Sequence, residues 1–239
     1  MPTMRKPLIT NHLLQLLADT DRHTLLQHCD VVQLKFADSL CEPQGPYRYL
    51  YFPLSGFISL VTKLAGHKPL EMGLIGNEGM LGVTLALGIS EAPMQAVVQG
   101  QGTAWRIEIA DLQHVLSISS HLRHILQQYL FIQLSQLSQS AACAHFHQLS
   151  PRLARWLLMS HDRAHCNDFF LTHQFLADML GVRRSGVTVA AGIMQQQQLI
   201  SYSRGIISIL DKKALERLAC ECYQSALDDY HSVLGEPAG

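Results

Sequence analysis

The spacing of hydrophobic residues changes along this chain of 239 residues. From residue 31 to residue 109, apolar and polar positions alternate in short stretches that proline and glycine separate, as in half-buried β-strands. Six stretches predict strands: Val31–Phe36, Tyr47–Phe52, Gly56–Thr62, Leu70–Ile75, Gln95–Val98 and Ala104–Ile109. Many short strands at close spacing are typical of a small sandwich or barrel. Before them, residues 8–28 have helical spacing around a polar break at residues 19–21, which predicts two short helices.

One long helix is predicted from His121 to Phe146, where neither proline nor glycine occurs. Two apolar rows run along it. The first contains Leu122, Ile125, Tyr129 and Ile132, and the second contains Leu126, Leu130, Leu134, Leu137 and Ala141. Spacings of three and four residues are those of a seam between paired helices, so one row can cover the barrel while the other contacts a partner. A helix buried within a single chain would show the same two rows.

The remaining residues predict a second domain that starts with a helix. Ser150 is suited to the N-cap of this helix and Pro151 to its first position, and the helix is expected over Arg152–His165. At the other end of the domain, Asp211 is expected to cap a last helix over Lys212–Tyr223, and the tail from Gln224 is expected to fray.

Between these helices lies a pattern that predicts a helix-turn-helix. Thr172 is a natural N-cap, Gly181 permits the left-handed turn that ends the first helix, and apolar positions between residues 182 and 194 predict a second helix. In such a pair the second helix can enter the major groove of DNA. Two strands joined by residues 203–205 follow and resemble the wing of a winged helix, with Arg204 placed for a phosphate contact.

The charge balance neither requires nor excludes a nucleic-acid partner. With 18 Lys and Arg against 19 Asp and Glu, the net charge of −1 excludes a polybasic binder. Between Arg152 and Arg217, however, nine basic residues face five acidic ones. No apolar run reaches the ~18 residues of a membrane span, and polar residues interrupt the N-terminal segment, so no secretory signal is expected. Six scattered cysteines without a Cys-x-x-Cys pair favour a reducing cytoplasm.

The outward positions of the second helix are candidates for reading DNA. Arg183 and Arg184 stand at its start, and an arginine there has the right shape to bind guanine O6 and N7 bidentately. A solvated helix face would look the same if these arginines stood alone, but the wing beside them favours DNA. The expected DNA contacts are Thr172, Arg183, Arg184, Ser185, Thr188, Val189, Ser203 and Arg204.

These residues resemble a known family. Residues 172–201 resemble, without gaps, the helix-turn-helix of the Crp/Fnr family of bacterial transcription regulators. Residues 51–56 and 76–82 are similar to the sensor barrel of one branch of that family, and helix 121–146 lies where the family has its dimer helix. The resemblance implies a homodimer on a palindromic site in double-stranded DNA, with RNA polymerase as a further partner. It places the dimer seam at Leu122, Ile125, Tyr129 and Ile132.

The resemblance also implies a fold and its divisions. The expected fold class is α+β, with a jelly-roll barrel similar to cyclic-nucleotide-binding domains. The expected domains are a sensor barrel with N-terminal helices over residues 1–118, a dimerisation helix over 119–148 and a winged helix-turn-helix over 149–239. Arg184 matches the guanine-reading arginine of the family. Ser185 and Val189 stand where many members have Glu and a second Arg, so we expect a different half-site sequence.

In the barrel, the resemblance argues against cyclic AMP as effector. Family members that bind it carry a Gly-Glu-Leu segment for the ribose and an Arg-Ser pair for the cyclic phosphate. Here Met80 replaces the carboxylate and Met94 the guanidinium, so the expected effector is apolar or differently charged, or the barrel serves only as a scaffold for the dimer. The candidate effector pocket comprises Gly79, Met80, Leu81, Gly82, Met94 and Gln95. No particular effector or cofactor is implied.

Other patterns that could carry chemistry are weaker. His161 and His165, followed by Cys166, have the i, i+4 spacing of two metal ligands on one helix face. Two further groups are also suggestive of metal ligands: Cys143, His145 and His147, and Cys220 with Cys222. With 13 histidines in the chain, chance pairs are expected, and no metal is assigned. No motif of a nucleophile, phosphate loop or dinucleotide site occurs, so an enzyme is not expected. Two alternatives stay open: a ligand-, redox- or haem-sensing module whose helix-turn-helix contacts protein, and a metalloenzyme that uses the His and Cys pairs.

Overall fold

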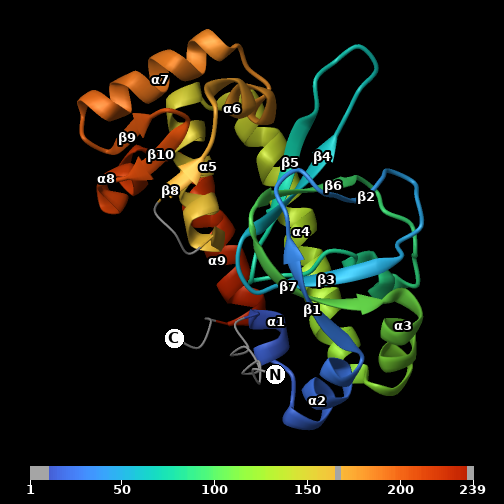
Figure 1. The fold of residues 1–239 in the computed structure, drawn as a ribbon. Helices are drawn as coiled ribbons and strands as arrows, with labels where there is room; N and C mark the ends of the chain where they lie inside the picture. Colours follow the sequence, from blue (N-terminus) through green and yellow to red (C-terminus); the bar gives the residue numbers. More distant parts are fainter. Residues whose placement is uncertain (1–10, 165–167, 236–239) are drawn as a thin grey trace, which may run out of the picture.

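A computed structural model describes residues 11–164 and 168–235 and shows a β-barrel, a long helix beside it and a helical domain with a small sheet (Figure 1). The helices are α1 (His12–Gln15), α2 (Asp19–Gln27), η1 (Val83–Leu87), α3 (Ile109–Ile118), α4 (Ser120–Phe146), α5 (Leu149–Ala164), α6 (His173–Leu180), α7 (Arg184–Gln196), α8 (Lys212–Leu218) and α9 (Cys222–Leu234). The strands are β1 (Cys29–Leu34), β2 (Ser39–Cys41), β3 (Tyr49–Pro53), β4 (Phe57–Thr62), β5 (Leu70–Ile75), β6 (Gln95–Gly100), β7 (Gly102–Glu108), β8 (Asp168–Phe170), β9 (Ile200–Ser203) and β10 (Ile206–Ile209).

The barrel consists of two antiparallel sheets with strand orders β1-β7-β3 and β2-β6-β4-β5. All six strands expected in this region are present, which confirms the interpretation as a sandwich or barrel. The sequence pattern missed β2, because this strand has only three residues and its pairing with β6 shifts register. It also missed α3, a ten-residue helix that follows β7 directly.

The long helix α4 is confirmed, with the Ser119 side chain accepting a hydrogen bond from the Leu122 backbone N–H at its start. The expected dimer seam is wrong, because its four residues are buried in this chain's own core. Leu122, Ile125, Tyr129 and Ile132 are only 0–4% exposed and pack with barrel residues and with α9. A second chain cannot reach side chains that the first chain already covers.

The second row of α4 is buried at its start and open only toward its end, because Leu126 is 0% exposed in the barrel core and Leu130 packs against that core. Leu134 is 62% exposed and its neighbour Phe131 is 61% exposed, and Ala141 continues the exposed face toward the end of the helix. The expected division into a buried and an open row thus holds only in the second half of the helix, where the open residues belong to the second row and not to the expected seam.

In the C-terminal domain three boundaries differ from the expectation. The helix expected over Lys212–Tyr223 is divided, because α8 ends at Leu218 and α9 begins at Cys222. Helix α5 begins at Leu149, so Ser150 lies inside its first turn and does not form its N-cap. The tail from Gln224 does not fray within the described residues, because α9 continues to Leu234. Helix α9 packs along α4 and buries Tyr230 and Leu234, both less than 8% exposed. Apolar residues at helical spacing thus stabilise α9, although the acidic composition of this segment had suggested a frayed tail.

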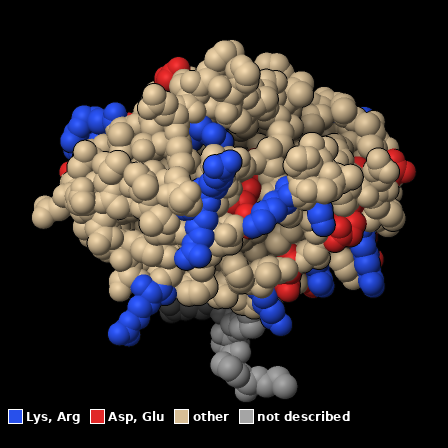
Figure 2. All heavy atoms as spheres, turned by 90° about the horizontal axis from the view of Figure 1, so that it is seen from above, with Lys and Arg blue, Asp and Glu red and all other residues tan. Residues whose placement is uncertain are grey.

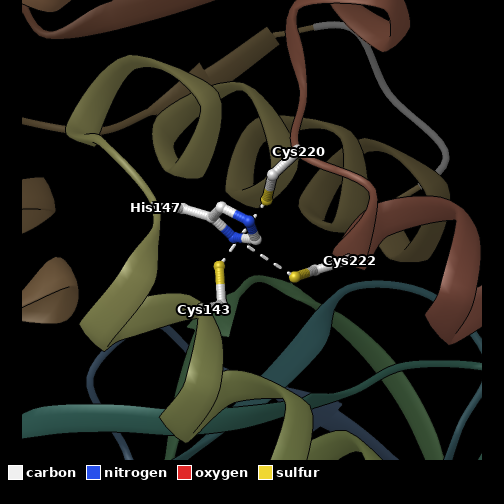
Figure 3. Close-up of side chains that lie close together, drawn as sticks. All are labelled: Cys143, His147, Cys220 and Cys222. Atoms are coloured by element: carbon white, nitrogen blue, oxygen red, sulfur yellow. Dashed lines mark hydrogen bonds between the residues drawn. The ribbon is translucent and has the colours of Figure 1, made fainter.

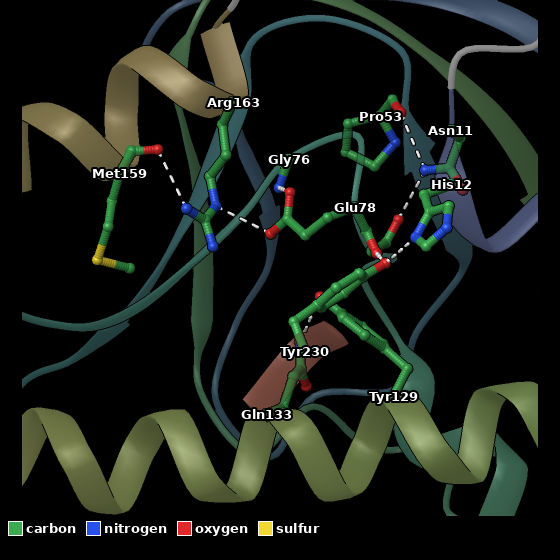
Figure 4. Close-up of polar contacts among 11 residues, drawn as sticks. Asn11, His12, Pro53, Gly76, Glu78, Tyr129, Gln133, Met159, Arg163 and Tyr230 are labelled. Carbon is green, nitrogen blue, oxygen red and sulfur yellow. Dashed lines mark hydrogen bonds and ion pairs between the residues drawn. The ribbon is translucent and has the colours of Figure 1, made fainter. Parts of the chain in front are cut away.

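Polar contacts attach the C-terminal domain to the barrel (Figure 4). The Arg163 guanidinium on α5 donates to Glu78 Oε1 at 2.9 Å, and the other oxygen of Glu78 accepts from the Gly76 backbone N–H at 3.0 Å. The Tyr230 hydroxyl on α9 donates to the Glu78 carbonyl at 2.6 Å and also contacts His12 Nδ1 at 2.6 Å. One barrel loop therefore contacts α1, α5 and α9 together.

Candidate nucleic-acid interface

The turn between α6 and α7 has the geometry that the sequence predicted. The Thr172 side chain caps α6 by accepting from the Phe175 backbone N–H at 3.1 Å. Gly181 ends the helix with φ +67°, a left-handed conformation that residues with a Cβ rarely adopt. The Val182 N–H then bonds the Ala177 carbonyl at 2.9 Å and closes the turn. These short-range bonds fix where α7 begins.

Helix α7 has one buried face and one exposed face. The buried side chains are Val187, Ala190, Ala191 and Met194, each at most 3% exposed. Arg183, Arg184 and Ser185 are exposed at its start, and Val189 is 63% exposed on the next turn. Ile193 extends this outer face at 44% exposure, although the sequence analysis did not single it out. Its place one turn after Val189 was the available signal.

Thr188 is exposed, but its hydroxyl is engaged in hydrogen bonds within the chain. Its hydroxyl donates to the Arg184 carbonyl at 3.1 Å and contacts His173 Nδ1 on α6 at 3.0 Å. The His173 ring also stacks on Tyr202 of β9, with ring centres 4.2 Å apart. Burial, followed by the charge of Arg184, lowers the pKa of His173, so the ring is neutral and can donate through Nδ1–H. Thr188 and His173 thus connect α6, α7 and the strand β9.

The β9–β10 hairpin forms a tight two-residue turn. Ser203 pairs with Ile206, and the two residues between them, Arg204 and Gly205, have φ of +50° and +84°. Positive φ at both central positions is the signature of a type I′ turn, which matches the twist of paired strands. Arg204 is exposed at the tip, and β8 adds a third strand on the other side of β10.

The cations of this surface are available to a ligand. Among residues 11–164 and 168–235, no ion pair involves Arg183, Arg184 or Arg204. Figure 2 looks down on the side of the molecule that carries α6 and α7, and Lys and Arg side chains project from it at several points with carboxylates between them. The arginines of the α7 start and the hairpin tip thus keep their full charge toward solvent.

The candidate effector residues do not enclose a pocket of ligand size. Met80 is 0% exposed, and Gly79 lies directly against the Tyr129 hydroxyl of α4. Leu81, Gly82 and Met94 do line a common cavity, but its volume is about 20 Å³, close to that of a single water molecule. Gln95 does not line this cavity; its amide bonds Ser39 and Glu42 at the barrel surface.

Of the histidine and cysteine groups in the sequence, two come together in the structure and the third lies partly outside the described residues. His161 contacts Asp162, whereas His165 and Cys166 lie outside the described residues. Cys143 and His147 at the end of α4 meet Cys220 and Cys222 from the α8–α9 connection, and His145 stays exposed (Figure 3). Both halves of this cluster are visible in the sequence, but no sequence signal joins them, since more than 70 residues separate them.

Comparison with known proteins agrees with this geometry. Residues 151–218 match the Crp-like helix-turn-helix domain. FixK2 from Bradyrhizobium japonicum has a similar structure, with a TM-score of 0.67, 14% identity and coverage of 80% of this chain and 98% of that one. A Crp/Fnr-family protein from Eubacterium rectale gives 0.65 at 18% identity, covering 86% and 96%. A Crp/Fnr-family transcriptional regulator from Thermus thermophilus gives 0.64 at 21% identity, covering 80% and 98%.

No curated protein matches the sequence. Within the described part of the chain, no helix is both long and apolar enough to span a membrane. Residues 151–218 are thus a Crp-like helix-turn-helix domain, in a chain with the fold of the Crp/Fnr-family transcription regulators.

Proposed function

We propose that this chain regulates transcription by binding a specific palindromic DNA site as a homodimer. The observation that carries the proposal is the exposed start of α7, where Arg183 and Arg184 form no ion pair with any other residue that the structure describes. The Thr172 cap and the Gly181 turn fix this helix in place. A rigid helix that presents arginine guanidinium groups can place them against guanine edges in the major groove.

The two arginine positions have different roles in this proposal. Arg184, in the first turn of α7, reads a base, whereas Arg204 at the hairpin tip neutralises a phosphate. Val189 and Ile193 present apolar surface suited to a thymine methyl group. Thr188 positions α7 through its internal hydrogen bonds instead of contacting a base.

Binding measurements on two variants test these roles. A preferred site is first selected from random DNA at near-physiological salt. Arg184→Ala should then cost ~1–3 kcal/mol on that site and little on random DNA. Arg204→Asn should weaken binding to both and flatten the salt dependence, while Asn keeps the type I′ turn. Lys35→Ala, on the exposed barrel surface, is the control and should bind as the unaltered protein does.

Two results would contradict the proposal. Equal losses of Arg184→Ala on specific and random DNA would remove the base-reading role. Absence of salt-dependent DNA binding by the unaltered protein would favour the alternative in which the helix-turn-helix contacts protein.

For the dimer, we propose the exposed face of the second half of α4, at Phe131, Leu134 and Ala141, as the seam. Phe131 and Leu134 leave large apolar side chains open, and Ala141 permits close helix approach further along. Two chains joined there would present two α7 helices to successive major grooves, ~34 Å apart. Leu134→Glu should give monomers in sedimentation, whereas Leu64→Glu, at a similarly exposed leucine in the β4–β5 loop, should leave the dimer intact. A Leu134→Glu protein that stays dimeric would place the seam elsewhere.

For the barrel, we propose that cyclic AMP is not the effector. Met80 and Met94 offer no charge to a ribose or phosphate, and the cavity of about 20 Å³ is far below the ~300 Å³ of a small-ligand pocket. Calorimetric titration with cyclic AMP should show no saturable heat. Micromolar binding at one site per chain would overturn this part of the proposal.

A further inference from the structure

Four metal-ligating side chains converge where α4 meets the α8–α9 connection. Cys143 Sγ lies 3.6 Å from Cys220 Sγ, and Cys222 Sγ lies 3.4 Å from His147 Nδ1. One ligand atom from each of the four residues can be chosen so that all lie within 4.8 Å of one another. Figure 3 shows the three sulfur atoms arranged around the imidazole ring of His147.

These separations suit a single tetrahedral metal ion. With Zn–S bonds of ~2.3 Å and Zn–N bonds of ~2.0–2.1 Å, tetrahedral angles place two sulfurs ~3.8 Å apart and a sulfur and nitrogen ~3.6 Å apart. The observed 3.6 and 3.4 Å are close to these values. A cluster of several iron atoms needs its ligands farther apart, because the metal atoms and sulfides lie between them. The set of three thiols and one imidazole is also one of the usual structural zinc sites.

A second group of residues orients the ligands as metal sites require. His147 turns Nδ1 toward the sulfurs and Nε2 toward the Glu221 carboxylate, at 3.1 Å. A ligating histidine usually donates its other N–H to a carboxylate or carbonyl, which fixes the tautomer and raises the basicity of the ligating nitrogen. The Gln139 side-chain amide donates to Cys222 Sγ at 2.9 Å, a contact that stabilises a thiolate.

Burial of ordinary free thiols does not explain why three cysteines lie together at this place. Cys29 and Cys41 are isolated thiols elsewhere in the chain, and burial raises their pKa values to about 12 and about 11. Cys143, Cys220 and Cys222 instead form a small buried cluster of their own. A disulfide between Cys143 and Cys220 would use two of the sulfurs and would leave Cys222 facing His147 without a function.

We propose that Cys143, His147, Cys220 and Cys222 bind one Zn²⁺ ion in a closed, four-coordinate structural site. On binding, the three thiols release their protons to solvent and the neutral imidazole supplies a lone pair, so the complex carries a net charge of −1. Arg155 donates to Ser140 Oγ at 3.2 Å, three residues before Cys143 on α4, and lines the same cavity as Cys143, so its guanidinium offsets part of that charge. Zinc has no redox chemistry here. The ion would instead join α4, the proposed dimer helix, to the C-terminal side of the Crp-like domain.

Metal content and affinity test the site on the full-length chain. Protein purified under reducing conditions with Zn²⁺ present, then desalted, should retain one Zn²⁺ per chain by elemental analysis. Replacement with Co²⁺ should give the intense visible absorption of a tetrahedral thiolate site. Cys222→Ser should lose the stoichiometric metal, and Cys41→Ser, at a half-buried cysteine on β2, should keep it. Glu221→Gln should weaken Zn²⁺ affinity by ~10–100-fold in competition with a chromophoric chelator.

His147→Ala provides a second variant if the cysteine variants fail to fold. His147 follows the last residue of α4 and its side chain is 24% exposed, so the fold should survive, as circular dichroism would show. Its Zn²⁺ affinity should fall at least tenfold. The proposal is overturned if the unaltered protein retains no Zn²⁺, if Cys222→Ser or His147→Ala binds as tightly as the unaltered protein, or if the site holds iron with sulfide or a Cys143–Cys220 disulfide.

Discussion

The carboxyl group of Glu71 should make the stability of this protein depend on pH near neutrality. Glu71 on β5 accepts hydrogen bonds from Ser59 Oγ at 2.6 Å and from Trp156 Nε1 at 2.7 Å, so it links the barrel to α5. Burial raises the pKa of this carboxyl to about 7, against the two hydrogen bonds and the charges of Arg155 and Arg163, which lower it. The folded protein therefore holds a proton that the unfolded chain releases near pH 4.5.

The sign and size of the effect follow from this shift. The favourable contribution is fully present below the unfolded pKa of 4.5 and is lost as the pH rises through about 7. At ~1.4 kcal/mol for each pKa unit between 4.5 and about 7, the whole loss is ~3.5 kcal/mol. Between pH 5 and pH 8 the free energy of unfolding should fall by roughly 2.5 kcal/mol on account of Glu71 alone.

Urea unfolding followed by tryptophan fluorescence can isolate this contribution. Glu71→Gln keeps the shape of the side chain and removes the titration. The difference between the variant and the unaltered protein should therefore shift by roughly 2.5 kcal/mol in favour of the variant from pH 5 to pH 8. Other titrating groups cancel in that difference. Replacing the Glu71 hydrogen bonds adds a constant free energy at every pH, so it does not change how the difference varies with pH.

An exposed glutamate provides the control for the Glu71→Gln variant. Glu91→Gln removes a carboxylate that is exposed on the barrel surface and should give a curve parallel to that of the unaltered protein. If the Glu71→Gln curve is equally parallel, Glu71 is ionised in the folded protein throughout this range, and the argument from burial is refuted.

Three further perturbations have expected outcomes by urea or thermal unfolding. Glu78→Gln leaves the Arg163 guanidinium buried without its carboxylate and should cost ~3–5 kcal/mol, and a loss under 1 kcal/mol would show that the pair is solvated. Gly79→Ala places a methyl group against the Tyr129 hydroxyl and should cost ~1–3 kcal/mol; unchanged stability would mean that the loop moves freely. Thr172→Ala removes the α6 cap and should cost ~1 kcal/mol, an expectation that an unchanged melting temperature would contradict.

Local rules account for what the sequence predicted about this fold. The Thr172 cap, the Gly181 turn and the apolar positions of α7 act within a few residues of one another, so the pattern alone located the helix-turn-helix. The same holds for the uninterrupted α4 and for the strands whose alternation runs over five residues or more. Elements with little local signal were missed, such as the three-residue strands β2 and β8.

Only the tertiary structure decided which face of each helix is buried and which distant elements contact one another. Both apolar rows of α4 have the same periodicity, and the packing of the barrel and α9 buries the row of Ile125 together with Leu126 of the other row, while it leaves Leu134 open. Helix α9 is itself stabilised by burial against α4 more than by its own composition. Cys143 and Cys220 are 77 residues apart and meet because the α8–α9 connection packs against the end of α4. Sequence spacing encodes which face of an element is apolar, but contact between distant elements depends on how the whole chain packs.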